Sequence, residues 1–199
     1  MPSLDDLKKR IGSVKSTQKI TKAMKMVAAA KLRRAQESAE SSRPYSDTMN
    51  EVIGSISNKV VSTSSERNLL TGTGDDQVQL LILFTSERGL CGGFNSSITK
   101  MMREKIEDLQ KLNKTVKIIC IGKKGYDILK RKYNDLIIDV IDMKAIKSVS
   151  YQDAKDISQK IIRMYFDNEF DTCSIFYNKF KSVIDQIPTH QKILPIENE

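Results

Sequence analysis

The residues of this chain that could do chemistry are few and far apart. The sequence holds one histidine, His190, and three cysteines, Cys91, Cys120 and Cys173. A catalytic histidine needs a carboxylate or a nucleophile held beside it, and the sequence places His190 alone in a surface segment. An odd number of widely spaced cysteines without a Cys-x-x-Cys pair argues against a disulfide framework or a zinc site, and for a reducing compartment.

Two glycine-rich turns that follow predicted strands are the other candidates for a chemical site. Gly89, Gly92 and Gly93 follow one strand, and Gly122-Lys123-Lys124-Gly125 follows the next. Neither spacing matches G-x-G-x-x-G or the phosphate loop G-x-x-x-x-G-K-[ST]. Tight strand-to-helix turns are favoured over phosphate sites by roughly four to one. We therefore assign no catalytic residue, no metal site and no cofactor.

The positive charge of the chain is concentrated at its N-terminal end. Residues 1–43 hold eleven Lys and Arg against four Asp and Glu, a net charge of +7, whereas the whole chain carries +8. A charge this uneven predicts a basic element that meets an acidic partner, joined to an ordinary globular domain. The longest strictly apolar run is residues 80–84, far shorter than the roughly 20 residues of a membrane span.

The basic segment has the pattern of one long helix. Ser3 is a suitable N-cap, and apolar residues recur at Leu4, Leu7, Ile11 and Val14 in a heptad-like seam. A lone helix of this length needs a partner helix along its seam. The chain holds no second helix of matching length, so we expect the partner in another chain or in a C-terminal segment that is missing. We expect a shaft over residues 1–61, kinked near Pro44, and a Ser/Thr/Gly-rich linker over 62–76.

The remainder alternates between short β-rich runs and amphipathic helices. Strands are predicted at residues 78–86, 115–122, 136–141 and 172–180, with an edge-like strand at 186–194 that Pro188 interrupts. Helices are predicted at 94–112, around Leu129 and at 151–166. This order predicts an α/β fold: a three-layer, Rossmann-like domain over 77–199 with a mostly parallel sheet.

Two segments carry a specific resemblance. QKITKAMKMVAAAK (residues 18–31) resembles the N-terminal helix of the gamma subunit of F-type ATP synthases. SERGLCGG (residues 86–93) is similar to the first strand-to-helix turn of that family, which usually has Asp where this chain has Glu87. Ser42-Arg43-Pro44-Tyr45 and Asn178-Lys179-Phe180 fit the same family in order and spacing, so the resemblance extends along essentially the whole chain.

The resemblance implies a rotor shaft that couples proton flow through the membrane sector to conformational change at catalytic sites on the beta subunits, where ATP is made. The implied partners are the alpha and beta subunits around the shaft, the epsilon subunit and the ring of membrane c subunits at the foot, and the C-terminal helix. The chain itself is then not an enzyme, and its location is peripheral, on the cytoplasmic face of a bacterial inner membrane or the equivalent matrix face.

The match also assigns site residues. Contacts of the shaft with the alpha and beta subunits are expected at Lys19, Ile20, Lys22, Met24, Lys25, Lys31, Arg33 and Arg34. The turn of the foot, which is the Rossmann-like domain, is expected at Arg88, Gly89, Leu90, Cys91, Gly92 and Gly93. Because the chain ends at Glu199, before the family's long C-terminal helix, we expect a truncated gamma subunit.

Two alternatives remain. Basic helices also bind nucleic-acid phosphates without sequence specificity, although this one is interleaved with Ala and Met and has no aromatic or Asn/Gln–Arg reading cluster. The other alternative is a small Rossmann-type nucleotide enzyme with a helical arm. It predicts saturable nucleotide binding by residues 76–199, and we expect no such binding.

Overall fold

The chain forms two compact units, Met1–Val52 and Ile53–Glu199. The computed structural model describes residues 3–57, 68–72, 74–146 and 149–196. The first unit consists of one helix, and the second contains the sheet. Residues 68–196, without 73 and 147–148, are called the sheet domain below.

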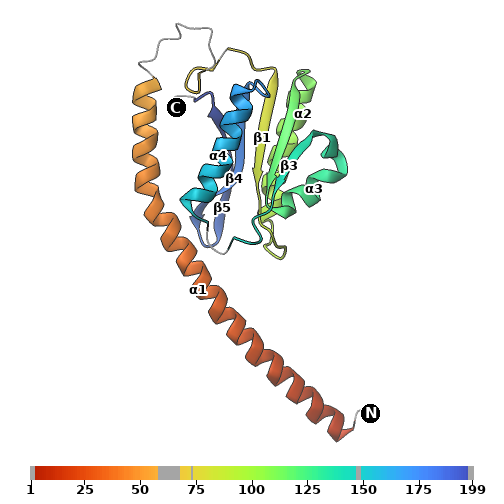
Figure 1. The fold of residues 1–199 in the computed structure, drawn as a ribbon. Coiled ribbons are helices and arrows are strands. Elements are labelled where there is room, and N and C mark those ends of the chain that lie inside the picture. Colours follow the sequence, from red (N-terminus) through yellow and green to blue (C-terminus); the bar gives the residue numbers. More distant parts are fainter. Residues whose placement is uncertain (1–2, 58–67, 73, 147–148, 197–199) are drawn as a thin grey trace. The chain divides into compact units, whose positions relative to one another are not determined.

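Helix α1 (Leu4–Ser57) is a single helix of 54 residues, drawn as one uninterrupted ribbon (Figure 1). The predicted cap is confirmed, since the Asp6 N–H donates to Ser3 Oγ at 3.2 Å and the Ser3 N–H donates to Asp6 Oδ2 at 3.2 Å. These two bonds satisfy donors that a helix N-terminus otherwise leaves unpaired. The helix continues through Pro44, and a kink at that residue stays a prediction.

The sheet domain has five strands in the order β3-β2-β1-β4-β5. They are β1 (Val78–Phe84), β2 (Thr115–Ile121), β3 (Ile137–Ile141), β4 (Thr172–Ser182) and β5 (Asp185–Leu194). β1 pairs in parallel with both β2 and β4, β2 pairs in parallel with β3, and only β5 is antiparallel. The central strand β1 is buried on both faces, which is why its sequence is almost continuously apolar.

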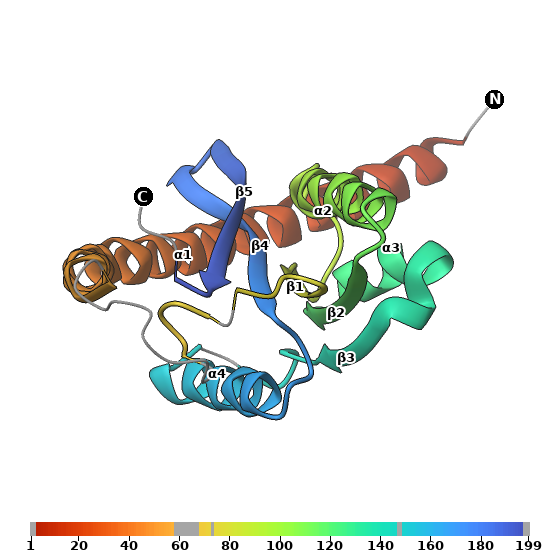
Figure 2. The same cartoon turned by 90° about the horizontal axis from the view of Figure 1, so that it is seen from above.

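Helices cover both faces of this sheet, as the three-layer prediction requires. α2 (Phe94–Lys111) and α3 (Lys123–Tyr133) lie on one face, and α4 (Tyr151–Phe166) lies on the other (Figure 2). The first core joins Leu81 and Leu83 of β1 to Met102 of α2, and the second joins Leu80 of β1 to Tyr165 of α4. Alternate residues of β1 therefore contribute to two separate cores. The predicted mostly parallel α/β fold is confirmed.

Several boundaries of helices and strands differ from the predictions by one or two residues. β1 ends at Phe84, and the predicted strand residues Thr85 and Ser86 belong to the following turn. The third strand begins at Ile137, because Leu136 ends a 3₁₀ helix. Pro188 does not interrupt β5, where it lies opposite Asn178. An edge strand tolerates proline because its outward side needs no hydrogen-bond donor.

The predicted linker falls partly outside the described residues, at 62–67 and 73, as do residues 58–61 at the end of the predicted shaft. Within the described part, Leu69 packs against the core beneath α4, and the Tyr165 hydroxyl donates to the Asn68 carbonyl at 3.1 Å. The domain boundaries stay a prediction. Among the described residues, none of the helices combines the length and apolar character that a membrane span requires.

Candidate functional site: an exposed charged helix and a braced turn

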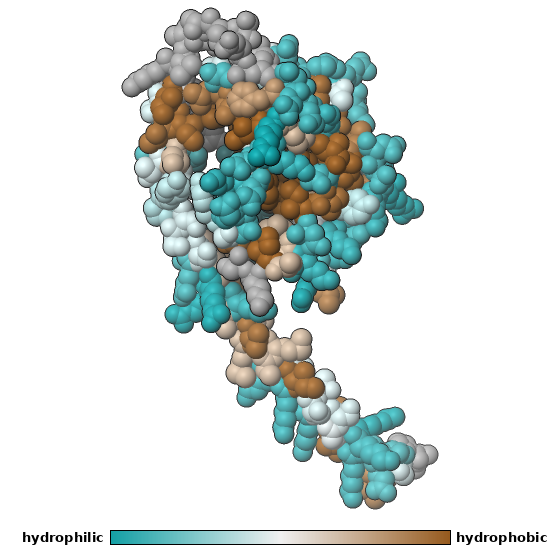
Figure 3. Space-filling view, viewed as in Figure 1, coloured by the Kyte–Doolittle hydropathy of each residue, from teal (hydrophilic) through white to brown (hydrophobic). Residues whose placement is uncertain are grey.

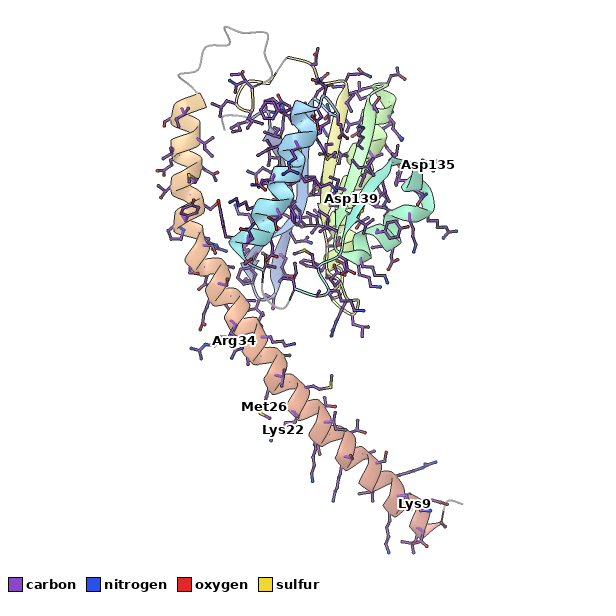
Figure 4. The ribbon with its side chains drawn as sticks, viewed as in Figure 1. Lys9, Lys22, Met26, Arg34, Asp135 and Asp139 are labelled. Carbon is purple, nitrogen blue, oxygen red and sulfur yellow. The ribbon has the colours of Figure 1, made fainter. Side chains whose placement is uncertain are left out.

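The predicted contact residues of the shaft all lie on the exposed surface of α1. At about 100° per residue they point in directions spread around the helix axis rather than to one side. The side chains of Lys22 and Arg34 extend away from the helix (Figure 4). A helix with basic groups on several sides suits a partner that surrounds it.

Apolar side chains of α1 are exposed as well. Leu4, Ile11 and Val14 are more than half exposed, at 76%, 54% and 67%, and so is Met24, at 67%. Brown, hydrophobic patches alternate with teal ones along the helix in Figure 3. Exposed large side chains repeated along one element mark an unfilled protein interface. Within the described residues, α1 thus exposes large apolar side chains repeatedly along its length.

The turn after β1 is built around the side chain of the buried Asn95, near the start of α2. Its Oδ1 accepts from the Ser86 N–H at 3.0 Å, and its Nδ2 donates to Cys91 Sγ at 3.0 Å. The Ser86 hydroxyl donates to the Arg88 carbonyl at 2.6 Å. This network holds Leu90 in the left-handed region (φ 63°) with its side chain fully exposed. Such a backbone persists only when its surroundings fix it.

The same turn is tied to the junction of β2 and α3. Thr85 Oγ1 accepts from the Gly125 N–H at 2.8 Å and donates to the Gly122 carbonyl at 3.1 Å. The Lys124 N–H donates to the Ser86 carbonyl at 3.2 Å. The N–H groups of Lys124 and Gly125, which a phosphate would need as donors, are therefore used within the chain.

Two further hydrogen bonds extend these ties to the segments beyond β3 and within β4. Glu87 Oε1 accepts from the Met143 N–H at 2.8 Å, and Asn178 Nδ2 donates to the Phe94 carbonyl at 3.0 Å. The turn is thus bonded to the chain at the carboxyl ends of β2 and β3 and to β4. Doubly wound proteins bind ligands in this crevice. Here Glu87 and Asn178 make hydrogen bonds within the chain at this edge.

The glycines at this edge have steric reasons to be glycine. A Cβ on Gly122, at φ 96°, would lie 2.2 Å from the Thr85 carbonyl oxygen. A Cβ on Gly125 would lie 2.9 Å from Leu83 Cδ2 and from Thr85 Oγ1. Both positions allow the β2–α3 turn to approach β1 closely, so the preferred interpretation of these glycines, as tight turns, is supported.

The cysteines and the histidine do not form a reactive group. Cys91 is exposed, whereas Cys120 and Cys173 are buried. Burial raises the pKa of the Cys120 thiol to about 12, and burial also raises the pKa of Cys173. The His190 ring stacks on Phe176 with 4.6 Å between ring centres. Across the described ranges, no three His, Cys, Asp or Glu side chains are grouped to hold a metal ion.

Carboxylates of the sheet domain serve as structural partners. Asp139 of β3, labelled in Figure 4, pairs with Lys160 of α4 at 2.6 Å. A hydrogen bond from Lys132 lowers the pKa of Glu107, and one from Lys130 lowers the pKa of Asp127. The Asp139–Lys160 and Glu107–Lys132 pairs connect neighbouring elements, whereas the Asp127–Lys130 pair lies within α3.

Sequence reasoning located the turn but not the residues that hold it. Arg88 to Gly93 lie together on one exposed loop, as expected. Asn95 was missed, and Asn178 was noted only as part of the family resemblance. The available signal was that polar residues flank the glycine turn, yet Asn178 becomes its neighbour only through the pairing of β4 with β1.

Comparison with known proteins agrees with this architecture. A family model described as ATP synthase matches residues 3–199. The ATP synthase gamma chain of Sinorhizobium medicae is 55% identical over 195 residues, covering 98% of this chain and 67% of that protein. The gamma chain of Rhizobium johnstonii is 56% identical over 199 residues, covering 100% of this chain and 68% of that protein. This chain thus spans about two thirds of the length of these relatives.

A solved structure shows the same fold. The central stalk and c-ring structure of the Tetrahymena thermophila mitochondrial ATP synthase matches with a TM-score of 0.67 and 29% identity, covering 88% of this chain and 72% of that one. These relatives lend no support to the nucleic-acid-binding alternative. The chain belongs to the gamma-chain family of ATP synthase, whose Tetrahymena member lies in a central stalk.

Proposed function

We propose that this gamma chain is the rotor shaft of its ATP synthase, coupling proton flow through the membrane sector to conformational change at catalytic sites on the beta subunits. The observation that carries the proposal is the surface of α1, a 54-residue helix roughly 80 Å long whose basic and apolar side chains are both exposed. A helix of this kind is completed by other chains or segments.

The chain acts without chemistry of its own. At the edge where doubly wound proteins bind ligands, Thr85, Glu87 and Asn178 make hydrogen bonds within the chain. Gly122 and Gly125 of the second glycine turn have a steric reason to be glycine, because a Cβ there would meet Thr85. ATP is formed on the beta subunits, and the gamma chain changes the affinity of each site as it turns. The shaft then couples the catalytic sites because it contacts each of them differently.

The proposed partners follow from the two kinds of surface. Alpha and beta subunits surround the shaft and meet Lys19, Ile20, Lys22, Met24 and Lys25. The apolar stripe pairs with a C-terminal gamma helix in an antiparallel coiled coil. The sheet domain is the foot, which contacts the epsilon subunit and the ring of c subunits. The complex places the chain on the cytoplasmic face of a bacterial inner membrane, or on the equivalent matrix face of an organelle.

Exposed charge pairs of the shaft each contribute at most about 1 kcal/mol and are screened by salt. Lys31, Arg33 and Arg34 therefore bias the angular position of the shaft instead of locking it. Arg33 also pairs with Glu37 of the same helix at 2.8 Å. Because both side chains are exposed, this guanidinium can bind a second partner with little loss of free energy.

Reconstitution tests the proposal. A gamma chain that carries this sequence and extends through a C-terminal helix should co-purify with alpha and beta subunits and support ATP-driven proton pumping. Failure to assemble with them would count against the shaft. A variant with Lys19, Lys22 and Lys25 changed to Gln should still fold, judged by circular dichroism, and should assemble more weakly.

A further inference from the structure

The apolar seam of α1 extends beyond the four residues that first identify it. Positions spaced alternately three and four residues apart, counted from Leu4, lie along one side of a helix in a coiled coil. Large, exposed apolar side chains fill the first four of these positions, which are Leu4, Leu7, Ile11 and Val14. The next three hold Gln18, Thr21 and Lys25. The seam then becomes apolar again at Ala28, Leu32 and Ala35. A polar stretch therefore divides the seam into two apolar parts.

The polar stretch shares one surface with the apolar part before it. Val14, Gln18, Thr21 and Lys25 line the same open groove on α1, and all four residues are exposed. A partner helix that contacts both apolar parts of the seam must therefore also cover the polar stretch between them.

The three polar residues need different things from a partner. Thr21 Oγ1 donates to the Thr17 carbonyl at 2.8 Å, so its hydroxyl is satisfied within α1 and its methyl group can face an apolar neighbour. Lys25 has a long stem that can keep its ammonium at the rim of a helix pair. Gln18 is shorter, and its terminal amide carries two donors and an oxygen acceptor. Once it is covered, this amide needs a hydrogen-bonding partner.

We propose that the helix which completes the shaft carries a polar side chain opposite Gln18, hydrogen-bonded to its amide within an otherwise apolar contact. The helix we assign is a C-terminal gamma helix, so the inference rests on the function proposed above. About a third of the Sinorhizobium and Rhizobium relatives lies outside the part that this chain matches. That third equals about half the length of this chain, which is enough for a helix as long as the 54 residues of α1.

A polar contact at this position selects the partner. A helix with an apolar residue opposite Gln18 leaves the amide buried without a hydrogen bond, and pairing is then weaker. A single polar pair within an apolar seam specifies the partner of a coiled coil in this way. In a parallel pair of two α1 helices, the two Lys25 side chains would lie close together and repel each other. The polar stretch therefore favours a different helix over a second copy of α1.

The test compares a gamma chain that extends through its C-terminal helix with the chain of 199 residues. Each carries Gln18→Met or the control Ser16→Met. Methionine favours a helix as glutamine does, but it lacks the amide donors and acceptor. Ser16 is exposed and lies about 200° from Gln18 around α1, on the opposite side. The rate of trypsin cleavage within α1 is measured under native conditions, with cleavage in the sheet domain as the reference.

In the extended chain, Gln18→Met should speed cleavage of α1 by about tenfold, because the polar residue of the partner helix loses its hydrogen bond and the pair opens more often. Ser16→Met should leave the rate unchanged. In the chain of 199 residues, neither substitution should change the rate by more than about twofold, since the proposed partner helix is not part of that chain.

Slower or unchanged cleavage of the extended Gln18→Met chain would overturn the proposal, because an apolar partner gains from methionine. Equal acceleration in the sheet domain would overturn it as well. If the chain of 199 residues sediments as a dimer that Gln18→Met weakens, the partner is a second copy and the proposal is wrong. Equal cleavage of α1 in the wild-type extended and 199-residue chains would instead contradict the helical pair of the proposed function, so the two hypotheses are distinguished.

Discussion

Helix α1 and the sheet domain use apolar residues in opposite ways. In the sheet domain Leu80, Leu81, Ile82 and Leu83 are entirely buried, in consecutive positions of one strand. In α1 the large apolar residues are exposed, including Leu4 at 76%. The sheet domain therefore has its own hydrophobic core, whereas α1 depends on surfaces that other elements supply.

This difference separates what stabilises the chain from what it does. Substitutions in the sheet domain should change the free energy of unfolding, and substitutions on α1 should change assembly. The predictions below probe this contrast from the largest expected effect to the smallest.

The largest effect is expected for Leu81→Ala, which leaves a cavity in the central strand. We expect a loss of about 4 kcal/mol in the free energy of unfolding, measured by urea denaturation. The matched shaft variant is Leu7→Ala, where the leucine is 44% exposed; it should change stability by less than about 0.5 kcal/mol. Equal losses would mean that α1 is packed as a core element, and the contrast would fail.

Glycine-to-alanine substitutions should have opposite signs in the two regions. Gly122→Ala forces a Cβ against the Thr85 carbonyl at a positive φ, and should destabilise the sheet domain by about 3 kcal/mol. Thermal unfolding followed by near-ultraviolet circular dichroism checks the loss. A stable variant would show that the turn can move away from β1.

Gly12→Ala should instead stabilise α1. Nothing lies within 4 Å of the Cβ position at Gly12, and alanine favours a helix over glycine by about 1 kcal/mol. Higher helicity of a peptide spanning residues 3–57 would confirm it. A decrease would mean that glycine has a special backbone role there.

The hydrogen bond from the Met143 N–H to Glu87 should contribute about 1 kcal/mol to the free energy of unfolding. Glu87→Ala removes the acceptor for the Met143 N–H, while Glu87→Gln keeps a neutral one and should lose less. Glu87→Asp, the residue usual in the family, shortens the side chain by one methylene and tests whether the longer one is needed. Equal stability of all three variants would contradict a role for this bond.

Single charges on the shaft should have the smallest effect. Lys25→Gln should weaken assembly with alpha and beta subunits by less than about 1 kcal/mol at low salt. The difference should vanish near 1 M salt, where the Debye length is about 3 Å. A salt-independent difference would mean that Lys25 is buried in the complex. Titration of the subunits by light scattering at two salt concentrations measures both values.

Much of the fold was predictable because local patterns determine it. Continuous apolar runs predicted buried parallel strands, and Ser3 and the amphipathic pattern predicted where helices begin and which side they bury. The residues predicted for α4, 151–166, match its observed ends. The errors lay where tertiary pairing decides, as at Pro188, which a continuous edge strand accepts.

The hydrogen bonds that hold the turn after β1 could not be predicted in the same way. Asn95 lies close to its turn in the sequence, but Glu87 reaches Met143 and Asn178 reaches Phe94 only after the strands are ordered. Spacing along the chain carries no information about such contacts. The shaft residues were assigned by family resemblance, and their partners stay a prediction.

The parallel pairing of β1 has a consequence for synthesis of the chain. Its Gln79 pairs with Val116 on one side and with Thr172 on the other. While the ribosome makes the residues between them, one flank of a mostly apolar strand has no neighbour, and such edges promote aggregation. The nascent chain therefore has an interval of exposure that closes only when β4 emerges.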